Sequence, residues 1–121
     1  MIQYDGFNLN VVVATYQENG ATALLLEDNE DGTPYTVVST NIEYHSEFLP
    51  KDCIYVPTYK NEEVVSFLLS KRILRSLPFP SIQQGYGTFK PYEINLGEVD
   101  EFIGTSLDEI MTNVAQTINE E

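Results

Sequence analysis

Alternating and apolar runs in the first half of the chain predict a three-stranded antiparallel meander. The run 7–16, FNLNVVVATY, begins as alternation and becomes β-branched and aromatic, which is typical of a strand. Asn19-Gly20 follows, and both residues tolerate the positive φ that a tight hairpin turn requires. The apolar run 21–27 then leads to a second turn at Asp31-Gly32 and to a third strand over 35–40.

The middle of the chain predicts a short buried strand and a helix. Residues 41–52 are mixed and polar and predict a connection, and the strand over 53–56 stops at Pro57. Asn61 is a good N-cap, and the two glutamates after it favour the positive end of a helix dipole. A broad apolar face then places a helix within residues 61–75.

The last third predicts one more strand and an amphipathic helix. Gly85-Tyr86-Gly87 opens a strand over 85–95, and Pro91 within it predicts an edge position. Ser106 and Glu109 make a capping box, which starts a helix over 106–119. Its apolar residues recur at helical spacing and form one stripe: Leu107, Ile110, Met111, Val114, Ala115 and Ile118.

These elements predict an α+β fold. We expect a single domain over residues 1–121, with the meander and the following strand in 1–57. An antiparallel sheet of four to five strands would carry the middle helix on one face. The C-terminal helix would cover a second surface or mediate self-association.

Composition indicates a folded cytoplasmic protein. The chain has 42% hydrophobic residues and lacks both a long apolar run and the basic-then-apolar start of a signal peptide. Its single cysteine, Cys53, cannot form an internal disulfide, which agrees with a reducing compartment. We therefore expect no membrane association.

The charge distribution is uneven and strongly negative, with a net charge of −13. Residues 1–50 and residues 91–121 each carry eight acidic residues and no basic one, whereas all six basic residues lie within 51–90. Such a field repels nucleic acid and anionic membranes and attracts basic protein surfaces. We expect a basic protein partner and no direct contact with nucleic acid.

Two acidic groups are candidates for an interaction surface. Its expected residues are Glu27, Asp28, Glu30, Asp31, Glu98, Asp100 and Glu101. The first group resembles the start of a calcium loop, but with Gly32 at position six the bidentate glutamate of position twelve is replaced by Val38. A solvated hairpin turn explains the first group better, and no metal is expected.

No catalytic or cofactor site is evident from the sequence. Cys53 and His45 are the only pair resembling a thiol nucleophile with its base, but Cys53 lies in an apolar strand and predicts core packing. The glycines at 85 and 87 precede a strand instead of the helix that a phosphate loop needs. The basic patch of Lys71, Arg72 and Arg75 is explained by the end of a helix. We therefore expect no cofactor and no enzymatic activity.

Five blocks of sequence lie in an order that resembles a family of small uncharacterised proteins of gut bacteria and their mobile elements. The blocks are 24–28 (LLLED), 30–35 (EDGTPY), 39–42 (STNI), 67–69 (FLL) and 85–91 (GYGTFKP). The resemblance covers residues 7–95 and excludes the C-terminal helix. It implies a fold and a mobile-element setting and brings no catalytic residues.

Charge and the absence of a site favour a non-enzymatic, acidic protein-binding module. One alternative is a DNA mimic that inhibits a DNA-binding or host-defence protein, which requires carboxylates in a double row at phosphate-like spacing. Another is a small enzyme with an unrecognised site, which requires a pocket with convergent polar groups.

Overall fold

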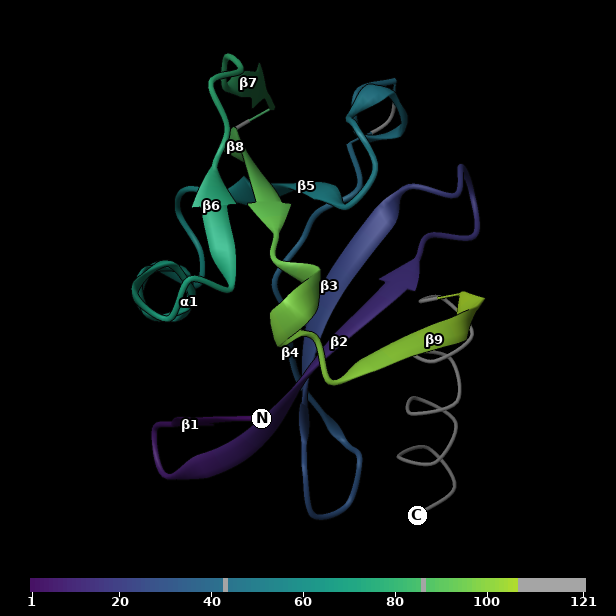
Figure 1. The fold of residues 1–121 in the computed structure, drawn as a ribbon. Coiled ribbons are helices and arrows are strands. Elements are labelled where there is room, and N and C mark those ends of the chain that lie inside the picture. The colour runs from purple at the N-terminus through teal and green to yellow at the C-terminus, as the bar shows by residue number, and fades with distance from the viewer. Residues whose placement is uncertain (43, 86, 107–121) are drawn as a thin grey trace.

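The computed structural model describes residues 1–42, 44–85 and 87–106, which form two β-sheets and one α-helix (Figure 1). Sheet A contains five strands: β1 (Ile2–Tyr4), β2 (Phe7–Thr15), β3 (Thr22–Asp28), β4 (Pro34–Val37) and β9 (Glu101–Ser106). Sheet B contains four strands: β5 (Cys53–Pro57), β6 (Leu74–Ser76), β7 (Ile82–Gln84) and β8 (Gly87–Ile94). The helix is α1 (Glu62–Ser70), and two short 3-10 helices are η1 (Ser46–Phe48) and η2 (Leu96–Glu98).

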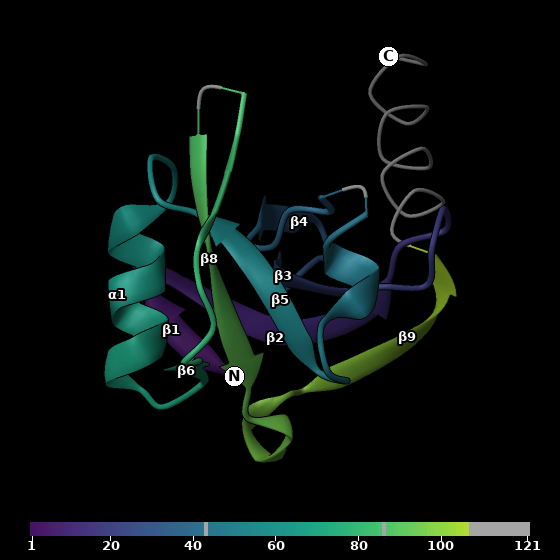
Figure 2. The same cartoon turned by 90° about the horizontal axis from the view of Figure 1, so that it is seen from above.

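The α+β class and the meander are confirmed, whereas the single predicted sheet is wrong. Strands β2, β3 and β4 pair antiparallel in sequence order, and Gly20 and Gly32 adopt the positive φ that their turns require. Residues 41–52 then connect to a second sheet, and an isolated bridge pairs Tyr55 of β5 with Thr40, which follows β4. The β-rich segments therefore divide into two packed layers (Figure 2).

Strand β8 lies in the centre of sheet B, so the predicted edge position is wrong. It pairs with β5 on one side and with β6 and β7 on the other. Pro91 is tolerated because it faces the gap between those two short strands: β6 ends opposite Tyr92 and β7 begins opposite Phe89. The Pro91 carbonyl accepts a hydrogen bond from the Leu77 amide in that gap.

The helix predicted within residues 61–75 forms as α1. It ends at Ser70, and Arg72 takes a left-handed conformation with φ of 61°. The Ile73 amide donates to the Leu68 carbonyl and the Arg72 amide to the Leu69 carbonyl, which is a Schellman motif with arginine where glycine is usual. This motif reverses the chain into β6. The predicted C-terminal helix over 106–119 lies outside the described residues, except that Ser106 ends β9.

The main core lies between sheet A, sheet B and α1. Leu9, Val11 and Val13 of β2 point to one face, where Ile54 of β5 and Leu68 of α1 also pack. Val12 and Ala14, at the alternate positions of β2, belong to a separate apolar cluster on the other face of sheet A. Strand β2 is therefore apolar on both faces.

Strand β9 joins sheet A next to β2 and runs parallel to it, which makes it the exception in an otherwise antiparallel sheet. In Figure 1 and Figure 2, β9 and α1 lie on opposite sides of the molecule. Among the described residues, no helix is long and apolar enough to cross a membrane.

Candidate functional site

An open pocket of about 700 Å³ lies where the β1–β2 turn, β4 and the start of α1 meet. We call it the acidic pocket, and the side chains that define it are Tyr4, Asp5, Tyr35, Tyr59, Glu62 and Glu63. No lysine or arginine is among its lining residues. Carboxylates and aromatic rings from three separate parts of the chain thus converge on one cavity.

Aromatic rings that pack edge-on or tilted against one another form the apolar side of the acidic pocket. The Tyr4 ring packs edge-on against Tyr35 with centroids 6.4 Å apart, and against Phe67 of α1 at 5.0 Å. Phe7, at the start of β2, packs against Tyr35 with ring centroids 5.3 Å apart. These contacts fix the ring positions before any ligand arrives, because each ring packs against another element.

Asn61 is the N-cap residue of α1 as predicted, but its side chain holds the start of the helix in another way. Asn61 occupies the N-cap position with a left-handed φ of 61°, and its side chain makes no capping hydrogen bond. Instead its amide donates to the Thr36 hydroxyl at 3.3 Å and to the Val37 carbonyl at 3.4 Å. The asparagine thereby ties α1 to β4 and places Glu62 and Glu63 beside the tyrosines.

The charged side chains that line the acidic pocket are all carboxylates. The pKa of the Tyr4 phenol is raised by burial first, and then by the charge of Glu63, by Tyr35 and by Asp5. Ion pairs between described residues join Met1 to Asp100 and Arg75 to Glu93, and neither involves a residue of this pocket. The carboxylates of Asp5, Glu62 and Glu63 therefore have no cationic partner within the described part of the chain.

Gly87 makes room for the Tyr59 ring at the rim of the pocket. A Cβ atom at residue 87 would lie 2.3 Å from Cε1 of Tyr59, far inside van der Waals contact. Tyr59 is 64% exposed and also packs edge-on against Phe89. Gly87 in strand β8 thus leaves the space that the exposed Tyr59 ring occupies.

The first predicted acidic group is largely committed to structure. Glu27 is buried, with 8% of its surface exposed, so it is not part of an exposed interaction surface. Asp28 accepts a hydrogen bond from the Glu30 amide, and Asp31 accepts from the amide and hydroxyl of Thr33. These bonds close the turn between β3 and β4, as the hairpin interpretation predicted.

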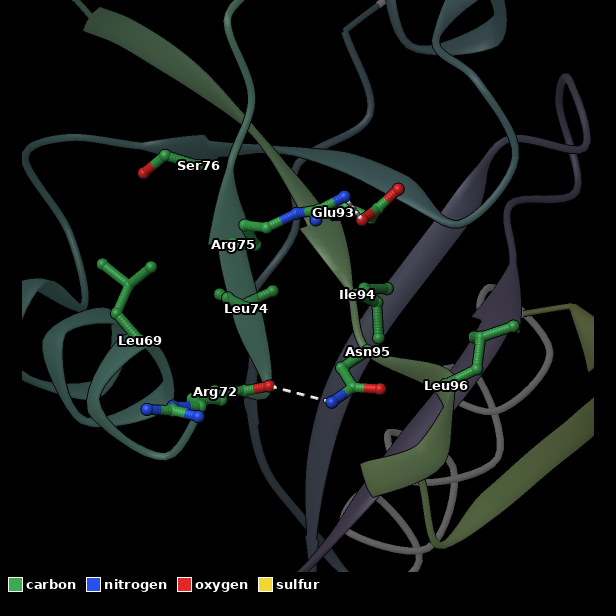
Figure 3. A pocket seen from close by; sticks show the side chains of 9 residues that line it. All are labelled: Leu69, Arg72, Leu74, Arg75, Ser76, Glu93, Ile94, Asn95 and Leu96. Atoms are coloured by element: carbon green, nitrogen blue, oxygen red, sulfur yellow. Dashed lines mark hydrogen bonds and ion pairs between the residues drawn. The ribbon is translucent and has the colours of Figure 1, made fainter.

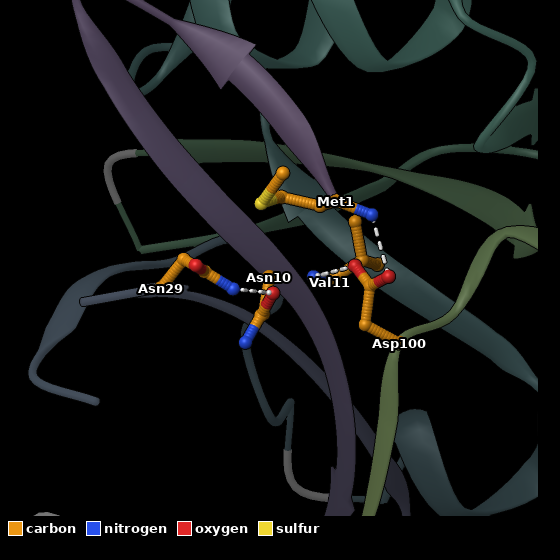
Figure 4. A network of polar contacts seen from close by, with 5 residues as sticks. All are labelled: Met1, Asn10, Val11, Asn29 and Asp100. Atoms are coloured by element: carbon orange, nitrogen blue, oxygen red, sulfur yellow. Dashed lines mark hydrogen bonds and ion pairs between the residues drawn. The ribbon is translucent and has the colours of Figure 1, made fainter. Parts of the chain in front are cut away.

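The second acidic group flanks β2 from the other side. Asp100 holds the N-terminal ammonium at 2.5 Å and accepts from the Val11 amide at 2.7 Å (Figure 4). On the other side of β2, Asn29 lies in the turn that carries the first group, and its side-chain amide donates a hydrogen bond to Asn10 of β2 (Figure 4). The structure therefore brings the two groups to opposite sides of β2, with Glu98 and Glu101 exposed.

Glu27 makes stability depend on pH. Burial first, and the charge of Glu101 second, raise its pKa above the ordinary 4.5. Because the folded protein holds this proton more tightly than the unfolded chain, the stability associated with the group is present below pH 4.5 and is lost as pH rises through the raised pKa.

Replacing Glu27 by glutamine is therefore expected to raise the melting temperature at pH 7 by about 2–4 °C, with no gain below pH 4.5. Thermal denaturation followed by circular dichroism at both pH values checks this result. Glu30→Gln removes the same charge from an exposed site and should give no such gain. A Glu27→Gln variant less stable than wild type at pH 7 would contradict the assignment.

The candidate nucleophile is placed in the core. Cys53 is buried in β5, and its thiol pKa is raised by burial first and then by Glu93 and Asp52, which opposes thiolate formation. His45 precedes the 3-10 helix η1 in the connection between the sheets. Within residues 1–42, 44–85 and 87–106, no three histidine, cysteine or acidic side chains are grouped to hold a metal ion.

A second pocket, of about 630 Å³, lies between α1, β6 and the end of β8 (Figure 3). Arg75 at its edge is paired with Glu93, and Asn95 donates to the Arg72 carbonyl at 3.2 Å. Lys71 lies over the Phe67 ring at 5.6 Å from its centroid. Two of the three side chains in the basic patch therefore have partners inside the chain.

Sequence reasoning missed the acidic pocket because its residues are distant in the chain. Asp5-Gly6 is a turn dipeptide of the same kind as Asp31-Gly32, and it follows the short apolar stretch Ile2–Tyr4. That signal predicts a first hairpin and would place Tyr4 and Asp5 at its turn. No local pattern, however, brings this turn to Glu62 and Glu63.

Comparisons of the chain with models of protein families, with curated proteins and with solved structures found no match.

Proposed function

We propose that the protein binds a basic segment of a partner protein and that the acidic pocket receives an arginine side chain of that segment. The observation that carries the proposal is the lining of this pocket: three carboxylates and three tyrosine rings converge on it without a basic residue. A guanidinium ion suits both kinds of group, because it pairs with carboxylates and stacks on aromatic faces.

The positions of the groups favour a bound cation over simple solubility. The negative charges of Asp5 and Glu63 both act on the Tyr4 hydroxyl, so a cation that enters the pocket would be attracted by more than one carboxylate at once. The ring contacts of Tyr4 and Tyr35 hold the apolar wall in place. These two rings would therefore need little ordering on binding.

A binding module of this kind differs from a DNA mimic in where its acidic residues act. Asp28, Asp31 and Asp100 already accept hydrogen bonds within the chain, and Glu27 is buried. This reduces the set available for a double row of phosphate-like charges. The acidic pocket, by contrast, requires only a local group of three carboxylates.

The charges of Glu62 and Glu63 provide the test. We expect Glu62→Gln/Glu63→Gln to weaken binding of a fluorescent 12-residue peptide of alternating glycine and arginine by about tenfold, measured by anisotropy. Glu30→Gln/Glu98→Gln removes two exposed charges elsewhere and should weaken it by less than about twofold. The same peptide with citrulline in place of arginine is the uncharged control.

An equal loss of peptide affinity in the two double variants would show that the peptide responds to net charge alone, and would contradict binding in the acidic pocket. Equal affinity for the arginine and citrulline peptides would show that binding does not depend on a positive charge, and would contradict the proposal of a bound arginine.

A further inference from the structure

Three pockets lie in a row along α1. Beside the acidic pocket is a smaller one of about 250 Å³ between α1, β5 and β8, which we call the middle pocket. The pocket of about 630 Å³ at the end of α1 is called the far pocket. Glu62 lines both the acidic and the middle pocket, and Leu69 lines both the middle and the far pocket. Each pocket is therefore the neighbour of the next.

One row of side chains on α1 borders all three pockets. Glu62, Ser66 and Leu69 follow one another at intervals of four and three residues, so they share one side of the helix. Arg72 comes three residues after Leu69, just beyond the end of α1. In Figure 3 its guanidinium group lies on the same side of β6 as Leu69. The row thus begins with a carboxylate and ends with a guanidinium group.

The charge changes sign along this row. The acidic pocket has three carboxylates and no basic residue, whereas three of the six basic residues of the chain line the other two pockets: Lys90, Arg72 and Arg75. Arg75 is paired with Glu93. Within residues 1–42, 44–85 and 87–106, no ion pair involves Arg72 or Lys90, and both side chains are exposed. A ligand that spans the row therefore meets negative charge at one end and positive charge at the other.

The row has the length of a short peptide segment. From Glu62 to Ser70, α1 rises about 12 Å, and Arg72 lies two residues further on. Four or five residues of an extended peptide cover about 13–18 Å. Between the two ends, the buried side chains of Val65 and Tyr92 line the middle pocket, whose volume of about 250 Å³ leaves room for small side chains.

We infer that the three pockets form one track for an extended segment of the partner protein, with an arginine in the acidic pocket and an aspartate or glutamate against Arg72. The two charged residues of the segment are four or five positions apart. The inference rests on the proposed function, because the bound arginine fixes one end of the segment. It adds that the segment carries charges of both signs, so a uniformly basic segment would fill only the acidic end.

The test uses three eleven-residue peptides and the full-length protein labelled with nitrogen-15. The first peptide has a central arginine and a glutamate five residues away on each side, with glycine and serine between, so that both chain directions are sampled. The second has glutamine in place of both glutamates. The third has the composition of the first, but its glutamates directly flank the arginine. Nuclear magnetic resonance titration gives the affinity and the location of each peptide.

The first peptide is expected to bind about fivefold more tightly than the second, and to shift the amide signals of Leu69 and Arg72 as well as those of the acidic pocket. The third should bind no more tightly than the second, because its glutamates would lie beside Glu62 and Glu63.

Arg72→Asn should abolish the difference in affinity between the first two peptides. Asparagine tolerates the left-handed conformation of residue 72, and the backbone carbonyl that accepts from Asn95 is kept. Lys51→Asn, the matched control, removes one exposed positive charge outside the three pockets and should keep the difference. The comparison of the three peptides on the wild-type protein depends on neither variant.

Equal affinity for the first two peptides, or a difference that Arg72→Asn leaves intact, would overturn the track, and so would an equal loss in Arg72→Asn and Lys51→Asn. The proposed function would survive these results if the second peptide still shifted the signals of Glu62 and Glu63. Binding of the second peptide that is no tighter than that of its citrulline counterpart would contradict the proposed function itself, and the inference with it.

Discussion

Replacement of Leu68 by alanine is expected to lower the free energy of unfolding by about 2–5 kcal/mol. Leu68 is 0% exposed and belongs to the main core between α1 and the two sheets. The smaller side chain removes buried apolar surface and leaves a cavity that the surrounding strands fill only in part. The backbone carbonyl of residue 68, which accepts the Ile73 amide in the Schellman motif, is kept in the variant, so the loss reports side-chain packing.

Urea denaturation followed by circular dichroism measures this loss. Leu96→Ala is the matched control, because Leu96 is 40% exposed in η2 and the same truncation there should cost less than about 0.5 kcal/mol. Similar values for the two variants would contradict the placement of Leu68 in the core. Glu62 and Glu63 belong to α1. The Leu68→Ala variant should therefore lose affinity for the arginine peptide at the denaturant concentrations at which it begins to unfold.

Replacement of Asp100 by alanine is expected to cost about 1–3 kcal/mol. Its carboxylate takes the place of a strand partner: one oxygen accepts from the Val11 amide, while the Asp100 amide donates to the Val11 carbonyl at 2.8 Å. The other oxygen holds the N-terminal ammonium. The alanine variant leaves the part-buried Val11 amide without its acceptor and removes the link between the N-terminus and the start of β9.

Asp100→Asn keeps an oxygen acceptor and should lose less stability than Asp100→Ala. Glu98→Ala, two residues earlier and exposed, is the control for removal of one negative charge. Hydrogen exchange at the Val11 amide should accelerate in Asp100→Ala and stay slow in Glu98→Ala. An alanine variant as stable as the Glu98 control would show that the carboxylate contributes nothing to the pairing of β9 with β2.

Local signals predicted the elements that local chemistry determines. Asn19-Gly20 and Asp31-Gly32 are turn dipeptides between apolar runs, and both turns of the meander form where those residues lie. The apolar run at Cys53 forms a buried strand, and the alternation in residues 7–16 places β2 correctly. In each case the residues that determine the structure are close together in the chain.

Pairings between distant segments were not predictable in this way. Strand β9 pairs with β2 in parallel although nearly 90 residues separate them. No local sequence signal, such as a turn dipeptide, predicts a pairing over that distance. Pro91 indicated an edge, but it is accommodated in the centre of sheet B by the gap between β6 and β7. Arg72 ends α1 in a left-handed conformation that sequence rules assign to glycine.

The acidic residues show the same division. Asp28 and Asp31 act within their own turn, as the hairpin interpretation predicted. Glu27 was expected at the surface with them, but it is buried in β3, and strand alternation places it on the same face of sheet A as Ala23 and Leu25. The acidic pocket depends on the tertiary contact between the β1–β2 turn and α1, so neither Asp5 nor Glu63 was recognisable as part of a site.

The location of a bound arginine is best measured by nuclear magnetic resonance. The full-length protein, labelled with nitrogen-15, would be titrated with the glycine-arginine peptide and then with its citrulline counterpart. The arginine peptide is predicted to shift the amide signals of Asp5, Tyr35, Asn61, Glu62 and Glu63 most strongly, and the citrulline peptide to leave them in place. Shifts centred instead on the turn at residues 28–31 or on Glu98 and Glu101, or spread evenly over all acidic residues, would contradict binding in the acidic pocket.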